Sequence, residues 1–217
     1  MHRGYHHGNL REVLIQQGVK LIEEKGVEGL TLREIGVRAG VSRTAAYRHF
    51  PDKTALLAAI SEAAFTEFAN CLERARDSVP GASEGNCVAR LAAMGRAYLL
   101  FARDFPAYYD AMFGLRCDLG SHQPARGEAG DRAFEVLRNV IIEGQQSGEL
   151  QAADAELIAL AVWTMSHGIV SLGLSAGLQP EDQQGIQQGM TNLLLKGIEG
   201  HANRTDLLPQ AAAQQQR

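Results

Sequence analysis

The stretch LTLREIGVRAGVSRTAAYRHFPDK, residues 30–53, decides the fold of the N-terminal part of the chain. Thr31 and Glu34 have the spacing of a capping box, in which each side chain pairs with the backbone amide of the other residue. A short helix is therefore expected to begin after Thr31 and to run through Ala39. Gly40 then supplies a tight turn, because glycine adopts positive φ at little cost.

A second short helix follows this turn. Ser42 is a candidate N-cap, and Pro51 ends the helix at or before Phe50. Ala46 and Phe50 are four residues apart and should face inward. The side chains expected to face outward are Arg43, Thr44, Tyr47 and Arg48. The pattern predicts a helix-turn-helix over residues 31–50, whose second helix enters the major groove of DNA.

The outward side chains suit DNA. Arg43 can reach a guanine edge or a phosphate, while Tyr47 and Arg48 offer a hydroxyl and a charge to backbone oxygens. The amides that open the helices starting near residues 32 and 53 would add phosphate sites, since a helix N-terminus carries partial positive charge.

The charge distribution divides the chain. The 217 residues carry a net charge of −4 and are 45% hydrophobic, which excludes a disordered polyanion and a globally basic nucleic-acid coat. Residues 1–54 nevertheless hold nine Lys and Arg against six acidic residues, and residues 55–217 hold twelve against nineteen. This split predicts a small basic module that contacts a polyanion and an acidic body that does not.

The apolar periodicity is helical nearly everywhere, so we expect an all-α protein. Beyond the helix-turn-helix, helices are expected to begin near Leu10 and to cover residues 53–76, 87–103, 128–147, 154–176 and 181–200, with an aromatic-rich piece at 105–114. We place a DNA-binding domain at residues 8–68, an effector-binding and dimerisation domain at 69–200, and a disordered polar tail at 201–217.

Residues 157–178 contain no Asp, Glu, Lys or Arg and are long enough to span a membrane. Internal Gly, Ser and His residues and acidic flanks favour a helix buried on all sides by protein instead. The N-terminus lacks the apolar core of a signal peptide, and Cys71, Cys87 and Cys117 fit neither a disulfide framework nor a zinc site. A cytoplasmic protein without a membrane span is expected.

An aromatic set in the body predicts an apolar pocket with a few polar tips, the composition of a small-molecule site. The candidate effector-pocket residues are Phe101, Tyr108, Tyr109, Met112, Phe113, Trp163 and His167, and most of them can equally be core. Tyr108 and Tyr109 point about 100° apart on a helix, so at most one faces a given cavity. His167 is either a core histidine bonded to a backbone carbonyl or a ligand-facing group.

Motifs for enzymes and cofactors are missing: no nucleophile elbow, P-loop, dinucleotide fingerprint or zinc-protease motif occurs. His6 and His7 lack a carboxylate or cysteine partner and are interpreted as a solvated arm, not a metal site. We therefore expect no enzyme activity, no cofactor and no metal.

Residues 30–35, 39–42 and 47–53, followed by Leu56 and Leu57, resemble the DNA-binding domain of the tetracycline-repressor family of bacterial transcription regulators. The resemblance covers about residues 8–65. It implies phosphate contacts from Thr31, Ser42, Tyr47, His49 and Lys53 and base contacts from Arg43 and Thr44, and we add Arg33 and Arg48 as further DNA-binding candidates. Ala45 and Ala46 depart from the family pattern. Ala45 lacks the hydroxyl that the family usually offers to DNA, and the small Ala46 implies tighter local packing.

Residues 5–11 and 163–168 are similar to the subgroup of this family named for its Trp/His/Gly signature. The resemblance implies a helical ligand-binding and dimerisation body whose last two helices form a four-helix bundle with those of a second subunit. The small residues Ser171, Gly173, Ala176 and Gly177 and the apolar Leu193, Leu194 and Ile198 agree with such close helix packing.

Together these features predict a homodimeric transcriptional repressor that binds double-stranded operator DNA. A small-molecule effector is expected to bind the repressor and release it from the DNA. The alternative is a DNA-anchored protein-interaction or sensory module without such an effector. Sequence preference in DNA binding discriminates the two hypotheses.

Overall fold

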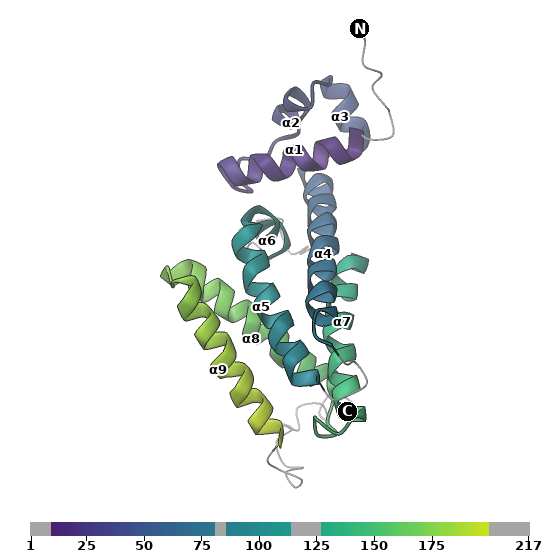
Figure 1. Ribbon diagram of the computed structural model, residues 1–217. Coiled ribbons are helices and arrows are strands. Elements are labelled where there is room, and N and C mark those ends of the chain that lie inside the picture. The colour runs from purple at the N-terminus through teal and green to yellow at the C-terminus, as the bar shows by residue number, and fades with distance from the viewer. Residues whose placement is uncertain (1–9, 81–85, 114–126, 200–217) are drawn as a thin grey trace, which may run out of the picture.

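The computed structural model describes residues 10–80, 86–113 and 127–199, and in these residues every regular element is a helix, which confirms the all-α prediction (Figure 1). The helices are α1 (Leu10–Lys25), α2 (Leu32–Arg38), α3 (Arg43–His49), α4 (Lys53–Asp77), α5 (Cys87–Asp104), α6 (Pro106–Phe113), α7 (Gly127–Gln146), α8 (Ala155–Ala176) and α9 (Pro180–Glu199). The expected tail at 201–217 lies outside the described residues.

The predicted signals of the helix-turn-helix are present. The Thr31 hydroxyl accepts a hydrogen bond from the Glu34 amide at 3.3 Å, and Ser42 Oγ accepts one from the Ala45 amide at 3.2 Å. Gly40, between α2 and α3, has φ +68°. The local chemistry of these residues therefore sets where both short helices begin and how the turn between them is made.

The capping box is only half formed. The Glu34 carboxylate accepts hydrogen bonds from Lys25 Nζ at 2.8 Å and Arg38 at 2.9 Å. Arg38 also pairs with Glu24 at 2.6 Å. Two cations draw Glu34 away from the Thr31 amide, because charge-assisted hydrogen bonds are stronger than a bond to a neutral amide. The side chain that was expected to cap α2 therefore ties α2 to α1.

Helix α4 belongs to two cores. Its N-cap, Asp52, accepts a hydrogen bond from the Ala55 amide at 2.8 Å. We call α1, α2, α3 and the start of α4 the head, and the rest of α4 with α5 to α9 the body. Leu56 and Ile60 are buried in the core of the head, whereas Phe65 and Phe68 belong to the core of the body. The cores change over between Ile60 and Phe65, slightly before the boundary at residue 68 that the sequence predicts.

Helix α6 also reaches the head. Its Ala107 and Ala111 are buried in the head core, although the sequence places them inside the body. In Figure 1 this helix lies directly under α1, beside the upper part of α4. The small alanine side chains allow this close approach, so body and head are joined through α4 and through α6.

In the body, α5 and α7 pack against α4, α8 packs against α7 and α5, and α9 lies outermost against α5 and α8 (Figure 1). Its centre is Phe68, which is 1% exposed. The rings of Tyr98, Phe101 and Trp163 lie 4.9, 5.0 and 5.8 Å from the Phe68 ring between centroids. Edge-to-face and tilted pairs at these distances add to the stabilisation that burial of the rings provides.

Distant carboxylates cap two helices of the body. Glu62 of α4 accepts a hydrogen bond from the Ala129 amide at the start of α7, at 3.1 Å. Glu149 accepts from the Cys87 amide at the start of α5, at 3.0 Å to each oxygen. The neighbouring Asn86 makes no side-chain cap bond. Each negative charge lies at the positive end of a helix, which stabilises the arrangement of α4, α5 and α7.

Among the described helices, α4 and α8 are long and apolar enough to cross a membrane by length and composition alone. In the fold, α4 is the helix shared by the two cores. Ala159 and Val170 of α8 are buried in the body, while the opposite side of α8 is exposed. In the described part of the chain, α8 is therefore buried on one side, not on all sides as the sequence predicts, because only one side faces the other helices of the body.

Replacing Phe68 with alanine removes the central ring of the body core. We expect Phe68→Ala to lower the free energy of unfolding by about 3–5 kcal/mol, the usual cost of such a cavity. Denaturation followed by the fluorescence of Trp163, the single tryptophan, measures this loss. Val88→Ala, at an exposed site on α5, is the matched control. A loss for Phe68→Ala no larger than that of the control would contradict this description of the core.

Candidate functional site

Helix α3 presents a polar, basic surface. The exposed side chains on it are Arg43, Thr44, Tyr47, Arg48 and His49. Ala46 and Phe50 are buried beneath them, as the spacing predicts. The helix contains no acidic residue, and the Arg43 guanidinium lies over the Tyr47 ring at 5.2 Å from its centroid. This contact holds the Arg43 side chain at the first turn of the helix, the part that reads bases in a helix-turn-helix.

Three cations of α1 and α2 differ in their contacts. Lys25 and Arg38 are paired with Glu24 and Glu34, and these contacts lower the pKa of both carboxyl groups. Arg33, in contrast, is exposed on α2. The ion pairs fasten α1 to α2, while Arg33 and the cations of α3 remain available to phosphates.

Lys53 has a structural contact of its own. Its Nζ donates a hydrogen bond at 3.1 Å to the backbone carbonyl of Glu28, in the connection between α1 and α2. The neighbouring Asp52 carboxylate occupies the N-terminus of α4. A carboxylate repels a phosphate, so Asp52 disfavours a DNA backbone contact at the N-terminus of α4. The cap of α2, Thr31, is neutral, and Glu34 in the first turn of α2 is paired with Lys25 and Arg38.

The two unusual alanines of α3 have different surroundings. Ala46 is fully buried, and a Cβ added to Gly36 of α2 would lie 3.5 Å from the Ala46 Cβ. This contact between two small residues brings α2 and α3 close together. Ala45 is half-buried and carries no hydroxyl to offer to DNA.

His167 of α8 lies between two tyrosines. Its Nδ1 is 2.9 Å from the Tyr109 hydroxyl and 3.2 Å from the Tyr98 hydroxyl. Burial lowers the pKa of His167 and raises the pKa of both tyrosines, so all three groups are neutral near pH 7. A tyrosine hydroxyl, not the backbone carbonyl considered from the sequence, therefore partners this nitrogen. Tyr98 was missed because its partner is 69 positions away.

The aromatic candidates surround this group. Tyr108 stacks on Phe101 and Phe105, on a different side of α6 from Tyr109, as their angular separation predicts. The centroids of the Phe113 and His167 rings are 4.7 Å apart. Trp163 packs on Phe68, and Met112 is half-buried against the same core. The cavity beside Tyr98 and Trp163 holds only about 20 Å³, enough for about one water molecule. An effector role for these residues stays a prediction.

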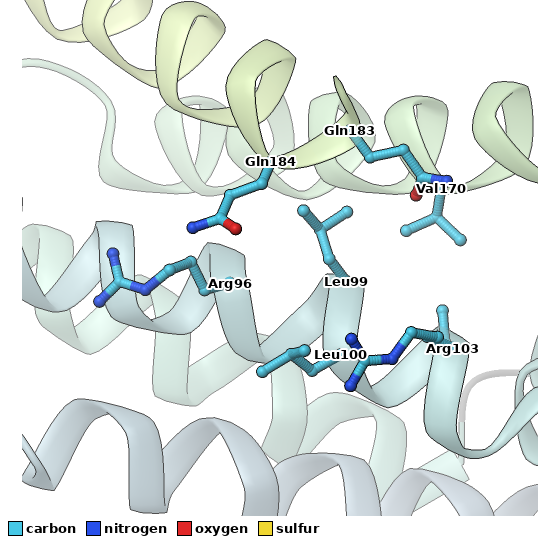
Figure 2. Close-up of a pocket in the computed structure, with 8 residues that line it drawn as sticks. Arg96, Leu99, Leu100, Arg103, Val170, Gln183 and Gln184 are labelled. Carbon is cyan, nitrogen blue, oxygen red and sulfur yellow. The ribbon is translucent and has the colours of Figure 1, made fainter. Parts of the chain in front are cut away.

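Two larger grooves lie elsewhere in the described part of the body. One, between α5 and α9, has a volume of about 230 Å³ and is lined by Arg96, Leu99, Leu100, Ala102, Arg103, Val170, Gln183 and Gln184 (Figure 2). The other, of about 440 Å³, lies between α8 and α9 and is lined by Ala161, Thr164, Met165, Gly168, Ile169, Leu172, Leu178, Ile186 and Met190. None of the seven candidate pocket residues lines either groove. The spacing of Arg96, Leu99, Leu100 and Arg103 on one helix face was the available signal for the first.

The described cysteines are shielded. Cys87 is buried, and burial together with Glu149 and Glu143 raises the pKa of its thiol to about 12. The pKa of Cys71 is raised as well, chiefly by burial. Both shifts disfavour the thiolate, the form of cysteine that is oxidised most readily. Cys117, His6 and His7 lie outside the described residues.

Two family models match the chain. Residues 14–60 match the model described as bacterial regulatory proteins of the tetR family, and residues 91–193 match the tetracyclin repressor-like C-terminal domain. The two matches cover the head and most of the body, more than two thirds of the chain. The chain belongs to the tetracycline-repressor family. The narrower Trp/His/Gly subgroup stays a prediction.

Individual relatives support membership of the tetracycline-repressor family. The class C tetracycline repressor of Escherichia coli is 45% identical over 56 residues, about a quarter (26%) of the length of each chain. A solved structure of a protein of unknown function from Rhodococcus sp. RHA1 has a TM-score of 0.76 and 31% identity, and covers 91% of this chain and 99% of that one. The structure of RolR in complex with resorcinol shares the fold, with a TM-score of 0.62, 19% identity and 88% of each chain covered.

The surroundings of His167 predict a pH dependence. Burial lowers its pKa below the usual 6.5, so as pH falls below 6.5 the unfolded chain takes up a proton before the folded one does. The free energy of unfolding should therefore fall as pH drops from 6.5 towards the lowered pKa, and stay level above 6.5. His167→Gln should reduce this slope in denaturation curves recorded between pH 5 and 7. Identical slopes for the two proteins would show that His167 is not the group responsible.

Proposed function

We propose that this protein is a transcriptional regulator that binds a palindromic operator as a homodimer and leaves it when a small-molecule effector binds the body. The observation that carries the proposal is the surface of α3, where five exposed polar, aromatic and basic side chains stand on a helix without acids. The set proposed to contact DNA is Thr31, Arg33, Ser42, Arg43, Thr44, Tyr47, Arg48, His49 and Lys53. Membership of the family supports this assignment.

The outer face of α8 and α9 is the proposed dimer interface. It carries the 440 Å³ apolar groove and exposed apolar side chains, among them Leu172 at 66% and Leu193 at 72% exposure. Exposed apolar surface of this extent favours burial against a partner. A second copy supplies the same face, and a two-fold dimer then places two copies of α3 on successive major grooves.

Effector binding in the body would change the position of the head through α4 and α6. Both helices are packed in the head core, so a shift of their body ends moves α3. A coupling free energy of about 1–3 kcal/mol between effector and DNA is typical of such linkage. RolR, which shares the fold, binds the small phenol resorcinol, and this favours a small-molecule effector here over a purely protein-sensing body.

The same reasoning leads us to propose a cytoplasmic protein that is not an enzyme, needs no cofactor or metal, and does not enter the membrane. The two helices that satisfy a membrane test by composition have other proposed roles, α4 as the shared core helix and α8 as a dimer helix.

Substitutions on α3 separate base reading from backbone contact. Arg43→Ala should weaken binding to the operator by about 1–3 kcal/mol and relax base preference at one position. Arg48→Ala should weaken binding to operator and random DNA alike and lower the salt slope by about one. Arg48 replaces Lys53 as the test residue, because Lys53 also holds the Glu28 carbonyl.

Affinities for an operator selected from genomic fragments and for random duplex, each over a range of salt, measure both effects. Arg138→Ala, on α7 of the body, should bind as the wild type does. Equal losses on both DNAs for Arg43→Ala would contradict its role as a base-reading residue.

A charge placed in the α8–α9 groove tests the dimer. Leu172→Glu should convert the dimer to monomers in sedimentation and lower operator affinity more than tenfold, because burying an unpaired carboxylate in an apolar interface is costly. Val88→Glu, exposed on the first turn of α5, is the control and should stay dimeric. A dimeric Leu172→Glu with unchanged operator affinity would place the interface elsewhere.

A further inference from the structure

The groove between α5 and α9 combines charge with an apolar floor. Leu99 and Leu100 of α5 and Val170 of α8 provide the apolar part, and Arg96 and Gln184 bring polar groups to one end (Figure 2). In this view Gln184 points down between Arg96 and Leu99, so a guanidinium and an amide lie beside an apolar surface. A ligand that satisfies all of these groups has one polar end and one apolar end.

The cationic group of the groove is Arg96. Arg103, two helical turns along α5, already pairs with its neighbour Asp104 at 2.7 Å. Arg96 is exposed and has no ion-pair or hydrogen-bond partner among the residues that the structure describes. A guanidinium binds a carboxylate through two parallel hydrogen bonds, and the match is lost with a neutral amide.

The groove stays open in the proposed dimer. Val170 is two residues from both Gly168 and Leu172 of the α8–α9 groove, which places it about 200° around α8 from each of them. Ile169, which also lines the α8–α9 groove, is about 100° from Val170, so the two grooves open on different sides of α8. A partner subunit seated on one leaves the other accessible to small molecules.

We propose that the α5–α9 groove is the effector site and that it takes a small carboxylate with an apolar body, the carboxylate on Arg96 and the apolar part over Leu99 and Val170. This rests on the proposed function. The volume of about 230 Å³ is below the range of about 300–1,000 Å³ of drug-sized sites, so the ligand is a single ring or a short chain.

The site is placed to act on the head. Its floor is the C-terminal half of α5, which leads directly into α6. Tyr108 of α6 stacks on Phe105 at the end of α5, and Ala107 of α6 lies in the head core. The other wall is α9, which carries Gln183 and Gln184. A carboxylate that draws Arg96 and Gln184 together changes how α5 lies against α9, and α6 transmits the change to α1.

The test uses the full chain and two matched pairs of probes: benzoate with benzamide, and hexanoate with hexanamide. Each amide keeps the shape of its acid and removes the charge. Binding is measured by ligand-observed NMR and calorimetry, and operator affinity is measured with and without each probe. The variants are Arg96→Gln and the control Arg138→Gln, with melting temperatures to establish that both are folded. Arg138 is a half-buried arginine on α7 that pairs with Glu135, outside the groove.

We expect at least one acid to bind the wild type ten or more times tighter than its amide and to weaken operator binding. Arg96→Gln should lose that difference, and Arg138→Gln should keep it. Acids and amides that bind equally, or acid binding unchanged in Arg96→Gln, would overturn the proposal. Acid binding that leaves operator affinity unchanged would overturn the effector role of the groove.

The two proposals fail separately. A wild-type protein that binds its operator specifically but none of the four probes leaves the proposed function standing and removes the carboxylate site. A protein that binds the acids through Arg96 but shows no preference among DNA sequences retains the site and removes the proposed function.

Discussion

The continuous helix α4 is the constraint on which the rest of the structure depends. Its 25 residues span about 37 Å, and no break separates the part buried in the head from the part buried in the body. Leu56 and Ile60 hold one end, and Phe65 and Phe68 hold the other. Because the helix is a member of both cores, the orientation of the DNA-facing helices is tied to the packing of the aromatic body.

Helix α6 provides a second connection between the head and the body. Ala107 and Ala111 lie against the head core, and Tyr109 of the same helix bonds to His167 of α8. One short helix thus contacts the head on one side and the centre of the body on the other. In the mechanism that we propose, a shift of α5, which precedes α6, or of α8, which Tyr109 contacts, would reach α1 through α6.

Local chemistry made much of the fold predictable. Thr31, Ser42 and Asp52 accept the hydrogen bonds expected of N-caps, because a cap depends only on residues within one turn of it. The caps that Glu62 and Glu149 provide, and the contact of Tyr98 with His167, join residues more than sixty positions apart. The sequence predicts that Glu34 caps α2, but its carboxylate pairs with Arg38 one turn along α2 and with Lys25 of α1, and only the second pairing joins two helices. Such pairs depend on the tertiary arrangement and leave no local pattern.

The central claim, that the basic head reads a specific operator, is tested most directly by footprinting the purified protein on the DNA upstream of its own coding region. Random duplex at physiological salt serves as competitor, because nonspecific binding to phosphates is present in any basic head. The account predicts protection of two symmetry-related half-sites, about one helical turn or a multiple of it apart, that survives the competitor. If genomic fragments selected for binding and this upstream region were protected no better than random duplex, the account would be contradicted.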